Sequence, residues 1–373
     1  MYASYVPNLR FPEFQGEWEK CKLGDVCTFL SGGTPKVDVK EYWNGTIPFV
    51  SAISMHDTYI LDSKLHISEE GLKHGSRLLT KNNLLLLVRG SMLWNTIPIC
   101  LNKSDVAFNQ DVKGIIAYDT INNEFLLYWL KSKEQRLKYM VTGTGLGAGK
   151  LDTSDLLSMI VYIPAMKEQD KVARLLSLFD ERIATQHKVI DKLQSLIKGI
   201  AQKIVRSNKP NVRLTECMEC KSSTLQESEV CEQGTYPVYG ANGIVGYLDN
   251  YNTEGEAIYI IKDGSGVGTV SYVTGKCSAT GTLNTLQTKE GYSLQYLYYL
   301  LKVFNFEPYK TGMAIPHIYF KDYGKAKVFC PSYTEQLQYA RLLSAIEGKL
   351  STEKNILTSL SLQKQYLLRQ MFI

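Results

Sequence analysis

Apolar residues recur at alternating steps of three and four along one long segment, residues 168–204, with Gln186 in the one polar slot. Pro164 lies just before the segment, no proline interrupts it, and the residues Ser-Asn-Lys-Pro at 207–210 end it. This spacing is typical of a helix that packs along a heptad seam. We therefore predict a single helix over Glu168–Ile204. Its seam positions are Leu176, Phe179, Ile183, Ile190, Leu193, Ile197, Ile200 and Ile204.

A second segment, which follows Pro331, shows the same alternation. Glu353 stands where the first segment has Gln186, and Lys364 is a further interruption. We predict a second helix with the same kind of seam. Its seam positions are Leu343, Ile346, Leu350, Leu357, Leu360, Leu367 and Met371.

The two helical segments belong to a longer internal repeat. Residues 164–177 (PAMKEQDKVARLLS) and 331–344 (PSYTEQLQYARLLS) are identical at eight of fourteen positions. Weaker landmarks upstream, such as 124–131 (EFLLYWLK) and 295–302 (QYLYYLLK), keep the same order. A duplication that only enlarged a fold does not explain why the agreement is concentrated in the helices. The pattern favours one scaffold that carries two different domains, a pseudo-twofold molecule suited to a twofold object such as duplex DNA.

Each predicted helix follows its own domain, so antiparallel pairing of the two helices would close the pseudo-twofold arrangement. A single amphipathic helix is typical of an ordinary core, but two matched ones favour pairing with each other. The span Leu176–Ile204 is about 40 Å at 1.5 Å per residue, and one turn of DNA covers roughly 34–36 Å. The helices would therefore act as a ruler between two half-site readers.

The segments outside the helices have a mixed pattern. Short β-branched and aromatic runs at 47–53, 84–88, 257–261 and 269–273 are separated by Gly, Asn and Asp turns. Each segment also has one late helical stretch, at 123–139 and at 293–303. The predicted fold class is α/β (mixed α+β), with two domains separated by a pair of long antiparallel coiled-coil helices. The predicted boundaries are 1–163 for the first domain, 164–206 for the first helix, 207–330 for the second domain and 331–373 for the second helix.

Composition narrows the class of protein without identifying it. The 373 residues suit two domains, and the apolar share of 44% is normal for a folded globular protein. No apolar run is long enough for a membrane span, and residues 1–10 show no secretory signal. The eight cysteines are spread along the chain as reduced thiols would be, so we expect a cytoplasmic protein. The net charge of +5 permits a polyanionic partner but does not demand one.

The glycine runs and polar clusters do not form a catalytic or cofactor motif. Residues 145–150 (GLGAGK) fail the P-loop pattern, because a threonine stands at the first glycine position and a leucine follows the lysine. Residues 263–269 (DGSGVGT) lack the full dinucleotide fingerprint. Cys217 and Cys220 have zinc-ligand spacing, but no second Cys or His pair follows them, so we expect no metal. The five histidines are scattered. We therefore expect that the chain is not an enzyme.

The order of short motifs in each half resembles the specificity subunit of type I restriction–modification systems, over nearly the whole chain. Each motif is weak alone, but the same order occurs twice. The landmarks of the first half are Leu23-Gly24-Asp25-Val26, Gly32-Gly33-Thr34-Pro35, Ile47-Pro48-Phe49-Val50 and Pro164 with Glu168-Gln169. Those of the second half are Tyr236-Pro237-Val238-Tyr239-Gly240, Gly246-Tyr247, Asp263-Gly264-Ser265 and Pro331 with Glu335-Gln336. The first helix departs from the pattern at its end, Lys203-Ile204-Val205, where an aromatic residue such as Phe372 often stands.

The resemblance implies a sequence-specific DNA-binding subunit in which each domain reads one half of a bipartite target. It implies that the helices dock two modification (methyltransferase) subunits, which bring S-adenosylmethionine. Restriction subunits would bring the ATP- and Mg-dependent translocation and cleavage, so no cofactor is expected in this chain.

We predict that Lys and Arg side chains neutralise phosphates while a few polar side chains read base edges. Loops at 31–36 and 263–268 combine small residues with nearby lysines, although each is also compatible with an ordinary tight turn. An exposed lysine is equally compatible with a solvated surface charge. The candidate DNA-binding residues are Lys36, Arg77, Lys81, Arg89, Asn95 and Lys150 in the first domain and Lys221, Asn242, Lys262, Asn284, Lys310 and His317 in the second.

Two other functions are compatible with parts of the pattern. One is the recognition part of a fused DNA methyltransferase, which the missing motifs disfavour and an S-adenosylmethionine binding assay on the isolated chain would test. The other is a non-catalytic protein-interaction scaffold with duplicated binding domains. A scaffold of that kind should show no preference among duplex sequences when modification subunits are present.

Overall fold

The computed structural model describes residues 6–145, 147–312 and 315–372. These residues form two compact units, with Met1–Gln186 and Ile356–Ile373 in unit 1 and His187–Asn355 in unit 2. The two longest helices, α6 (Met166–Arg206) and α10 (Tyr333–Gln370), each contribute one part to either unit. The predicted helix over residues 168–204 is thus confirmed as one uninterrupted element. The division into four segments that the sequence suggests stays a prediction.

Unit 1 contains most of the strands of the first half of the chain. In chain order its elements before α6 are β1 (Glu19–Lys22), α1 (Leu23–Val26), β2 (Cys27–Ser31), η1 (Lys40–Tyr42), β3 (Ile47–Val50), η2 (Ala52–Ser54), β4 (Tyr59–Ile60), β5 (Leu65–Ile67), α2 (Glu69–Lys73), β6 (Leu78–Leu79), β7 (Leu84–Leu87), β8 (Arg89–Gly90), η3 (Ser91–Trp94), β9 (Ile99–Asn102), β10 (Val106–Phe108), β11 (Val112–Ala117), α3 (Asn123–Ser132), α4 (Glu134–Tyr139), β12 (Thr142–Thr144), β13 (Ala148–Lys150), α5 (Thr153–Leu157) and β14 (Ile160–Ile163).

The core of unit 1 lies around the five-stranded sheet of order β2-β11-β7-β9-β4. Its central strand β7 consists of four leucines, and all of them are fully buried. A strand that is apolar on both sides must be covered on both faces. Helix α3 packs against the neighbouring strand β9, and its residues Phe125–Leu130 are all buried. Smaller sheets of order β5-β3-β10-β6, β12-β13-β8 and β1-β14 complete the unit.

Unit 2 repeats the plan with fewer strands. Its elements after α6 are β15 (Val212–Arg213), α7 (Leu214–Cys217), β16 (Met218–Ser222), η4 (Glu227–Glu229), β17 (Tyr236–Gly240), β18 (Gly243–Leu248), β19 (Ala257–Ile261), β20 (Val270–Val273), β21 (Ser278–Ala279), β22 (Leu283–Thr288), α8 (Leu294–Leu301), η5 (Glu307–Tyr309), α9 (Phe320–Tyr323) and β23 (Lys327–Val328). The strands form sheets of order β16-β22-β19-β20, β18-β17-β21 and β15-β23, and α8 packs against β19 and β20.

The local predictions hold with two adjustments. The runs at 84–88, 257–261 and 269–273 form β7, β19 and β20. The run at 47–53 is shorter than predicted, because β3 ends at Val50 and the 3-10 helix η2 follows it. The late helical stretch at 123–139 divides into α3 and α4 at Lys133, whose φ of −94° and ψ of 10° leave the helical region.

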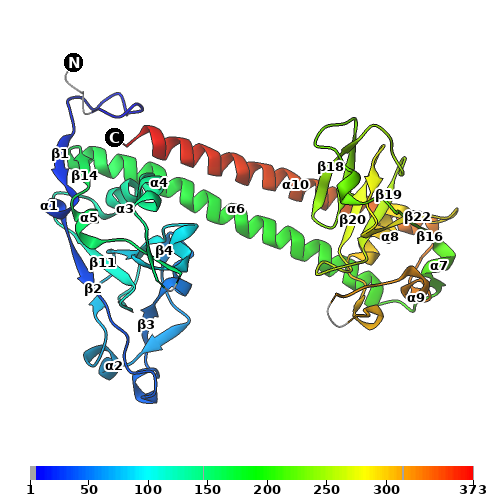
Figure 1. Ribbon diagram of the computed structural model, residues 1–373, viewed down its shortest axis with the longest axis horizontal. Coiled ribbons are helices and arrows are strands. Elements are labelled where there is room, and N and C mark those ends of the chain that lie inside the picture. The colour runs from blue at the N-terminus through cyan, green and yellow to red at the C-terminus, as the bar shows by residue number, and fades with distance from the viewer. Residues whose placement is uncertain (1–5, 146, 313–314, 373) are drawn as a thin grey trace. The chain divides into compact units, whose positions relative to one another are not determined.

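The two long helices run antiparallel within each unit (Figure 1). In unit 1, Lys364 of α10 forms an ion pair with Asp180 of α6. Further back along α6, Leu176 shares a core with Met371 and Phe372, which directly follow the end of α10. In unit 2 the same direction brings Gln194, Ile197 and Ala201 of α6 to one cavity with Glu347, Leu350 and Lys354 of α10.

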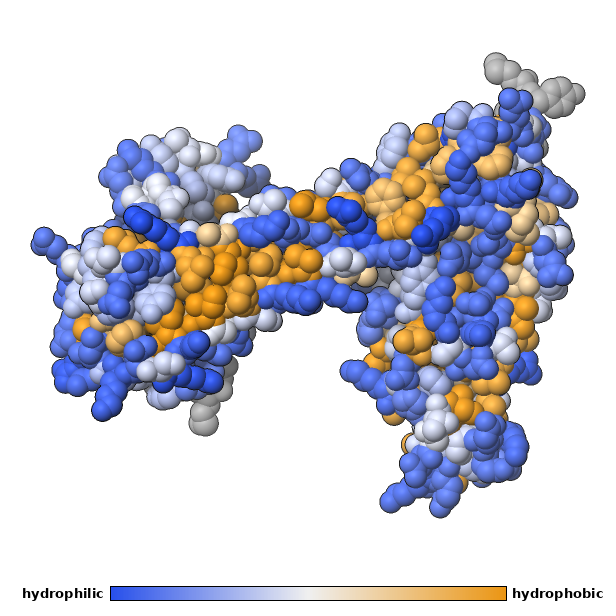
Figure 2. All heavy atoms as spheres, turned by 180° about the vertical axis from the view of Figure 1, so that it is seen from behind, coloured by the Kyte–Doolittle hydropathy of each residue, from blue (hydrophilic) through white to orange (hydrophobic). Residues whose placement is uncertain are grey.

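The predicted seam residues are covered to different extents. Leu176, Ile190, Ile197, Leu343 and Leu350 are buried, and Phe179, Ile183, Leu193, Ile346, Leu357, Leu360 and Leu367 are half-buried. The polar residues of the seam, Gln186 and Glu353, are also buried. In unit 2 an apolar stripe of α6 stays accessible, because Leu196 is 48% exposed and Val189 and the seam residues Leu193 and Ile200 are half-buried. Figure 2 shows a band of apolar side chains along the long helices there.

The glutamine of the repeated Glu-Gln pair explains why the helices and domains keep one register. The amide of Gln169 accepts a hydrogen bond from the backbone N–H of Asn122 at 2.8 Å and donates to the carbonyl of Pro164 at 2.9 Å. The amide of Gln336 accepts from the N–H of Ser293 at 2.9 Å and donates to the carbonyl of Pro331 at 2.9 Å. Both glutamines are 1% exposed. Each therefore joins the start of a long helix to the N-cap of the late helix of its domain, α3 or α8.

Within the described residues, no helix is both long and apolar enough to cross a membrane.

Candidate nucleic-acid interface

The small sheet β12-β13-β8 gathers three of the predicted DNA-binding residues of unit 1. Lys150 of β13 and Arg89 of β8 are direct register partners, and both are exposed. Asn95 follows the short helix η3 and is exposed beside them. Trp94, which sequence reasoning missed, is 50% exposed and its indole N–H donates to the carbonyl of Gly147 at 3.0 Å. This sheet therefore presents two cations, an amide and an aromatic ring to solvent.

Lys36 and Arg77 lie on two loops that pack against each other. Both side chains are exposed. A Cβ on Gly33 would lie 2.4 Å from the carbonyl oxygen of Gly75, and a Cβ on Gly75 would lie 2.7 Å from the Cα of Pro35. Only glycine permits so close an approach of two backbones. The glycine run that suggested a phosphate-binding loop therefore has a packing role.

A turn at residues 109–111 connects the two groups of cations. The side-chain amide of Gln110 accepts a hydrogen bond from the Thr34 hydroxyl at 2.7 Å. The carbonyl of Asp111 accepts the backbone N–H of Arg89 at 3.2 Å. Nearby on β11, Lys113 donates to the Ser31 hydroxyl at 2.6 Å. We call the surface formed by Lys36, Thr34, Arg77, Gln110, Arg89, Asn95 and Lys150 the polar strip of unit 1.

Lys81 lies away from the polar strip. It precedes β7, whereas Arg89 follows that strand, so the two residues stand at opposite ends of β7. Its backbone N–H donates to the Asp105 carboxylate at 2.8 Å, in a turn that passes through Asn82 at φ 64°.

Unit 2 carries different chemistry at the position that corresponds to Arg89 and Lys150. The backbone N–H of Leu151 donates to Val88 at 2.8 Å, and that of Ile318 donates to Lys262 at 2.9 Å. This match makes His317 the counterpart of Lys150 and Asp263 the counterpart of Arg89. His317 Nδ1 lies 2.6 Å from Asp263 Oδ1, and both side chains are about one-third exposed.

Two more of the predicted residues of unit 2 lie on the same pair of loops. Lys262 immediately precedes Asp263 and is half-buried. Lys310 is half-buried and its ammonium group contacts the Glu307 carboxylate at 2.6 Å. The structure therefore gathers Lys262, Lys310 and His317 around one surface. The preceding loop includes residues 313–314, which lie outside the described residues.

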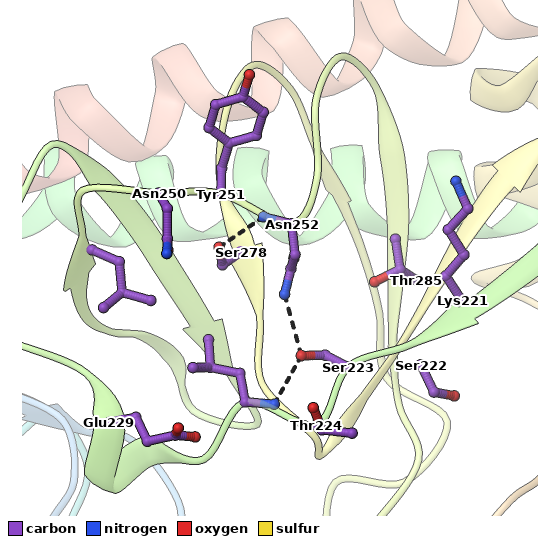
Figure 3. A pocket seen from close by; sticks show the side chains of 12 residues that line it. Lys221, Ser222, Ser223, Thr224, Glu229, Asn250, Tyr251, Asn252, Ser278 and Thr285 are labelled. Carbon is purple, nitrogen blue, oxygen red and sulfur yellow. Dashed lines mark hydrogen bonds between the residues drawn. The ribbon is translucent and has the colours of Figure 1, made fainter.

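Lys221 lies on a polar cleft of about 680 Å³ between the two larger sheets of unit 2 (Figure 3). The cleft is lined mainly by hydroxyl and amide side chains, with Glu229 as its acid. Asn252 is held on its floor by hydrogen bonds to the Ser223 hydroxyl at 3.2 Å and to the backbone of Ala279 at 2.9 and 3.0 Å. Amides and hydroxyls in fixed positions are the groups that read base edges. Apart from Lys221, sequence reasoning did not identify this cleft.

Two predicted residues of unit 2 lie elsewhere. Asn242 is exposed in the turn between β17 and β18. Asn284 is 3% exposed, and its amide donates to the buried Tyr323 hydroxyl at 3.1 Å. Because the Asn284 side chain is buried and hydrogen-bonded within the domain, we do not include it in the candidate interface.

The remaining sequence motifs are placed as follows where the structure describes them. Of residues 145–150, Ala148–Lys150 form β13, which pairs with β12, and Leu146 lies outside the described residues. Cys217 is buried and Cys220 is half-buried. Among the described residues, no group of three or more His, Cys, Asp and Glu side chains is placed to hold a metal ion.

The comparison with known proteins begins with the family model. The model of the type I restriction modification DNA specificity domain matches the chain twice, at residues 15–195 and 207–362. Each match contains one domain and most of the long helix that follows it. The internal repeat predicted from the sequence is therefore a repeat of this domain.

Several curated relatives are similar to parts or most of the chain. The specificity subunit of the EcoR124I/EcoR124II enzyme of Escherichia coli is 30% identical over 46% of this chain and 43% of its own length. The EcoprrI specificity subunit of Escherichia coli is 23% identical over 92% of this chain and 90% of its own. The first curated relatives are matched over less than half of their length.

A solved structure agrees with the fold of the described residues. The S subunit of the type I restriction-modification system of M. genitalium has a TM-score of 0.68 and 20% identity, with 99% of both chains covered. At this identity the likeness shows the fold. The two matches of the family model, which cover most of the sequence, show that the chain belongs to the type I restriction modification DNA specificity domain family.

Proposed function

We propose that this chain is the DNA-specificity subunit of a type I restriction–modification complex, in which each domain reads one half of a bipartite DNA target. The observation that carries the proposal is the contrast between a repeated scaffold and divergent surfaces. The Gln169 and Gln336 joints are the same in both repeats. The corresponding pair of bridge partners, in contrast, is Arg89 and Lys150 in one repeat and Asp263 and His317 in the other. A protein that reads two different half-sites requires this combination.

The polar strip of unit 1 suits both parts of DNA recognition. Lys36, Lys150 and Arg77 would neutralise phosphates, and Arg89 and Asn95 have the donor geometry that reads base edges. In unit 2 the cleft around Asn252 and the loops of Lys262 and His317 would serve the same purpose. The DNA-binding assignment of each side chain stays a prediction.

The accessible apolar stripes of the long helices fit subunit docking. In unit 1, Leu362 is 58% and Tyr366 is 54% exposed, and in unit 2 Leu196 is 48% exposed. Apolar residues at helical spacing that stay accessible favour a partner helix. We propose that two modification (methyltransferase) subunits bind there and supply S-adenosylmethionine, while restriction subunits supply ATP- and Mg-dependent functions. On this proposal the chain acts in the cytoplasm and catalyses no reaction itself.

Methylome sequencing of a host with and without this chain, in the presence of its modification subunit, tests the proposal. We expect a split methylated motif that appears only when the chain is present. Methylation that is independent of the chain, or that follows no sequence, would refute the assignment. Binding of S-adenosylmethionine by the isolated chain would instead support a fused methyltransferase.

A further inference from the structure

A carboxylate on each long helix holds the late helix of the attached domain in both units. In unit 1 the hydroxyl of Tyr128, on α3, donates to Asp180 Oδ2 of α6 at 2.8 Å. In unit 2 the hydroxyl of Tyr299, on α8, donates to Glu347 Oε2 of α10 at 2.7 Å. Asp180 lies 11 residues after Gln169, and Glu347 lies 11 residues after Gln336. The tyrosine and the carboxylate are thus repeated at equivalent positions.

The lysine that pairs with the carboxylate comes from a different element in each unit. In unit 2 the longer side chain of Glu347 reaches Lys302 of the same domain, with 2.9 Å between Oε1 and Nζ. In unit 1 the equivalent lysine, Lys131, donates to the Thr58 hydroxyl at 2.7 Å instead. Asp180 takes its cation from α10, where Lys364 forms the ion pair. Both arrangements neutralise a carboxylate that is partly withdrawn from water.

Packed side chains do not fill the space beside these two carboxylates. A cavity of about 420 Å³ lies beside Asp180 and one of about 300 Å³ lies beside Glu347. The cavities are lined at equivalent positions of the repeat, with Lys131 and Lys364 in the first and Lys302 and Ile197 in the second. Where space remains between a domain and its helix, directional hydrogen bonds decide the angle between them. Tyr128 is fully buried, so its hydroxyl needs a partner.

Two attachment points on one helix define an orientation, which one point does not. The glutamine joint and the carboxylate are separated by 11 residues, which is about 16 Å along a helix. Buried ion pairs contribute little to stability compared with apolar packing, and their best-known role is to select one arrangement. We infer that Asp180 and Glu347 are positioning residues that lock each domain at one angle on its helix and so set the spacing at which the two half-sites are read. The spacing part of this inference rests on the proposed function.

A first experiment tests the locking without DNA. Tyr128→Phe removes the hydroxyl that joins α3 to Asp180, together with its 3.0 Å contact with the Tyr59 hydroxyl of the same domain. It leaves both partners of the ion pair between Asp180 and Lys364 in place. Spin labels at Lys36→Cys and Arg182→Cys, both exposed and both in unit 1, report the distance between domain and helix. We expect the distance distribution to broaden or shift in the variant. An unchanged distribution would overturn the inference whatever the protein binds.

The matched control is Tyr296→Phe. Tyr296 is 2% exposed, and its hydroxyl donates to the backbone carbonyl of Phe329 at 2.7 Å, within the domain of unit 2. This change removes a buried hydroxyl without touching either carboxylate. Thermal unfolding of both variants establishes that they fold.

A second experiment tests the spacing in the complex with modification subunits. Methylation rates are measured on duplexes whose half-sites are separated by the native spacer or by one base pair more or fewer. We expect Tyr128→Phe and Tyr299→Phe to lower the preference for the native spacer roughly fivefold, in line with the loss of the hydrogen bond that each hydroxyl donates to its carboxylate. Equal losses on all three spacers, as expected for Tyr296→Phe, would contradict a positioning role. If the unsubstituted complex showed no sequence preference, the proposed function would fail, and the label distances would still decide the locking.

Discussion

Side chains at one strand position give the two domains different electrostatic characters. Arg89 and Lys150 place two permanent cations side by side in unit 1. The corresponding Asp263 and His317 form a compact pair, with 2.6 Å between Oδ1 and Nδ1. Arg presents a planar set of donors suited to guanine, whereas Lys acts as a point charge suited to phosphate. Substitutions at these neighbouring residues should therefore have distinguishable effects.

We expect Arg89→Ala to weaken binding of the complex to its target by about 1–3 kcal/mol and to relax the base preference at one position. Lys150→Ala should weaken binding to all sequences similarly and reduce the dependence of log K on log salt by about 1. Titrations with the target and with single-base variants, at several salt concentrations, measure both effects. Lys64→Ala, an exposed lysine in the turn between β4 and β5, is the control. An unchanged base preference in Arg89→Ala would contradict its role in base reading.

Lys131 predicts a pH dependence of stability. Burial lowers the pKa of Lys131 to about 8, and the nearby charge of Lys364 also lowers it. An unfolded lysine titrates near 10.5. Between these values the unfolded chain binds more protons than the folded one, so this group makes stability rise with pH. Below pH 8 the folded protein bears the full cost of the buried ammonium group.

Lys131→Met removes this group at similar volume. The free energy of unfolding of the variant minus that of the unsubstituted protein should be largest below pH 8. This difference should decline by on the order of 3 kcal/mol between pH 8 and pH 10.5. Urea unfolding at intervals across this range measures the difference, in which the titration of tyrosines and cysteines common to both proteins cancels. A difference that does not change with pH would show that the ammonium is not buried as described.

At the scale of elements, the glutamate at the start of each long helix has a different structural role in each repeat. Glu168 is 2% exposed and receives the Arg10 guanidinium at 2.7 and 2.8 Å and the Trp18 indole N–H at 3.3 Å. It thereby ties the segment before β1 to the start of α6. Glu335, its counterpart, is exposed and accepts the N–H and hydroxyl of Ser332 in a helix-capping arrangement. The environment, not the residue type, sets the role.

Arg10→Met should therefore destabilise unit 1 by about 3 kcal/mol, because it leaves a buried carboxylate without its cation. The double variant Arg10→Met/Glu168→Leu should recover most of the loss, since an apolar pair no longer buries an unpaired charge. Glu335→Gln should cost less than about 1 kcal/mol, as expected for an exposed cap. Chemical unfolding of the three proteins tests the comparison. Equal effects of Arg10→Met and Glu335→Gln would refute it.

The apolar stripe of α6 predicts an asymmetry in subunit docking. Leu196 is exposed on this stripe, and Gln363, which lies 167 residues later, occupies the equivalent position of α10. We expect Leu196→Asp to remove one of two modification subunits, because a charge in an apolar helix interface is unpaired. Gln363→Asp should leave both in place. Native mass spectrometry of the reconstituted complexes reads the stoichiometry, and loss of both subunits, or of neither, in Leu196→Asp would contradict the docking site.

At the scale of the whole molecule, the scaffold was predictable from the sequence and the surfaces were not. Steps of three and four predict long helices directly, since one turn of a helix contains 3.6 residues. Lys36 and Arg77, in contrast, become neighbours through close glycine contacts between distant loops. Asn284 looked like a loop residue but lies in β22, where the strand pattern LNTLQT alternates poorly. Such long-range juxtapositions have no local signature in a single chain.

The two ends of the second domain, at Asn211 and Cys330, are hydrogen-bonded to each other. The side-chain amide of Asn211 donates to the carbonyl of Cys330 at 2.8 Å and accepts the Cys330 N–H at 2.8 Å. Strands β15 and β23, immediately inside this tie, pair antiparallel. A segment whose two ends meet in this way can be exchanged without displacing the helices on either side.

We therefore expect that replacing residues 212–329 with the corresponding segment of a family member changes one half of the methylated motif and preserves the other half and the spacer. The Asn211 tie, the Gln336 joint and Glu347 stay in place in this exchange, so the new domain meets the same attachment points. To engage all of these points, the new domain needs its own equivalents of Ser293, Tyr299 and Lys302. A domain that lacks the tyrosine should still specify the new half-site, but the complex should lose discrimination between spacers. Methylome sequencing reads all three features at once. A motif that changed in both halves, or in neither, would mean that the two domains do not read separate half-sites.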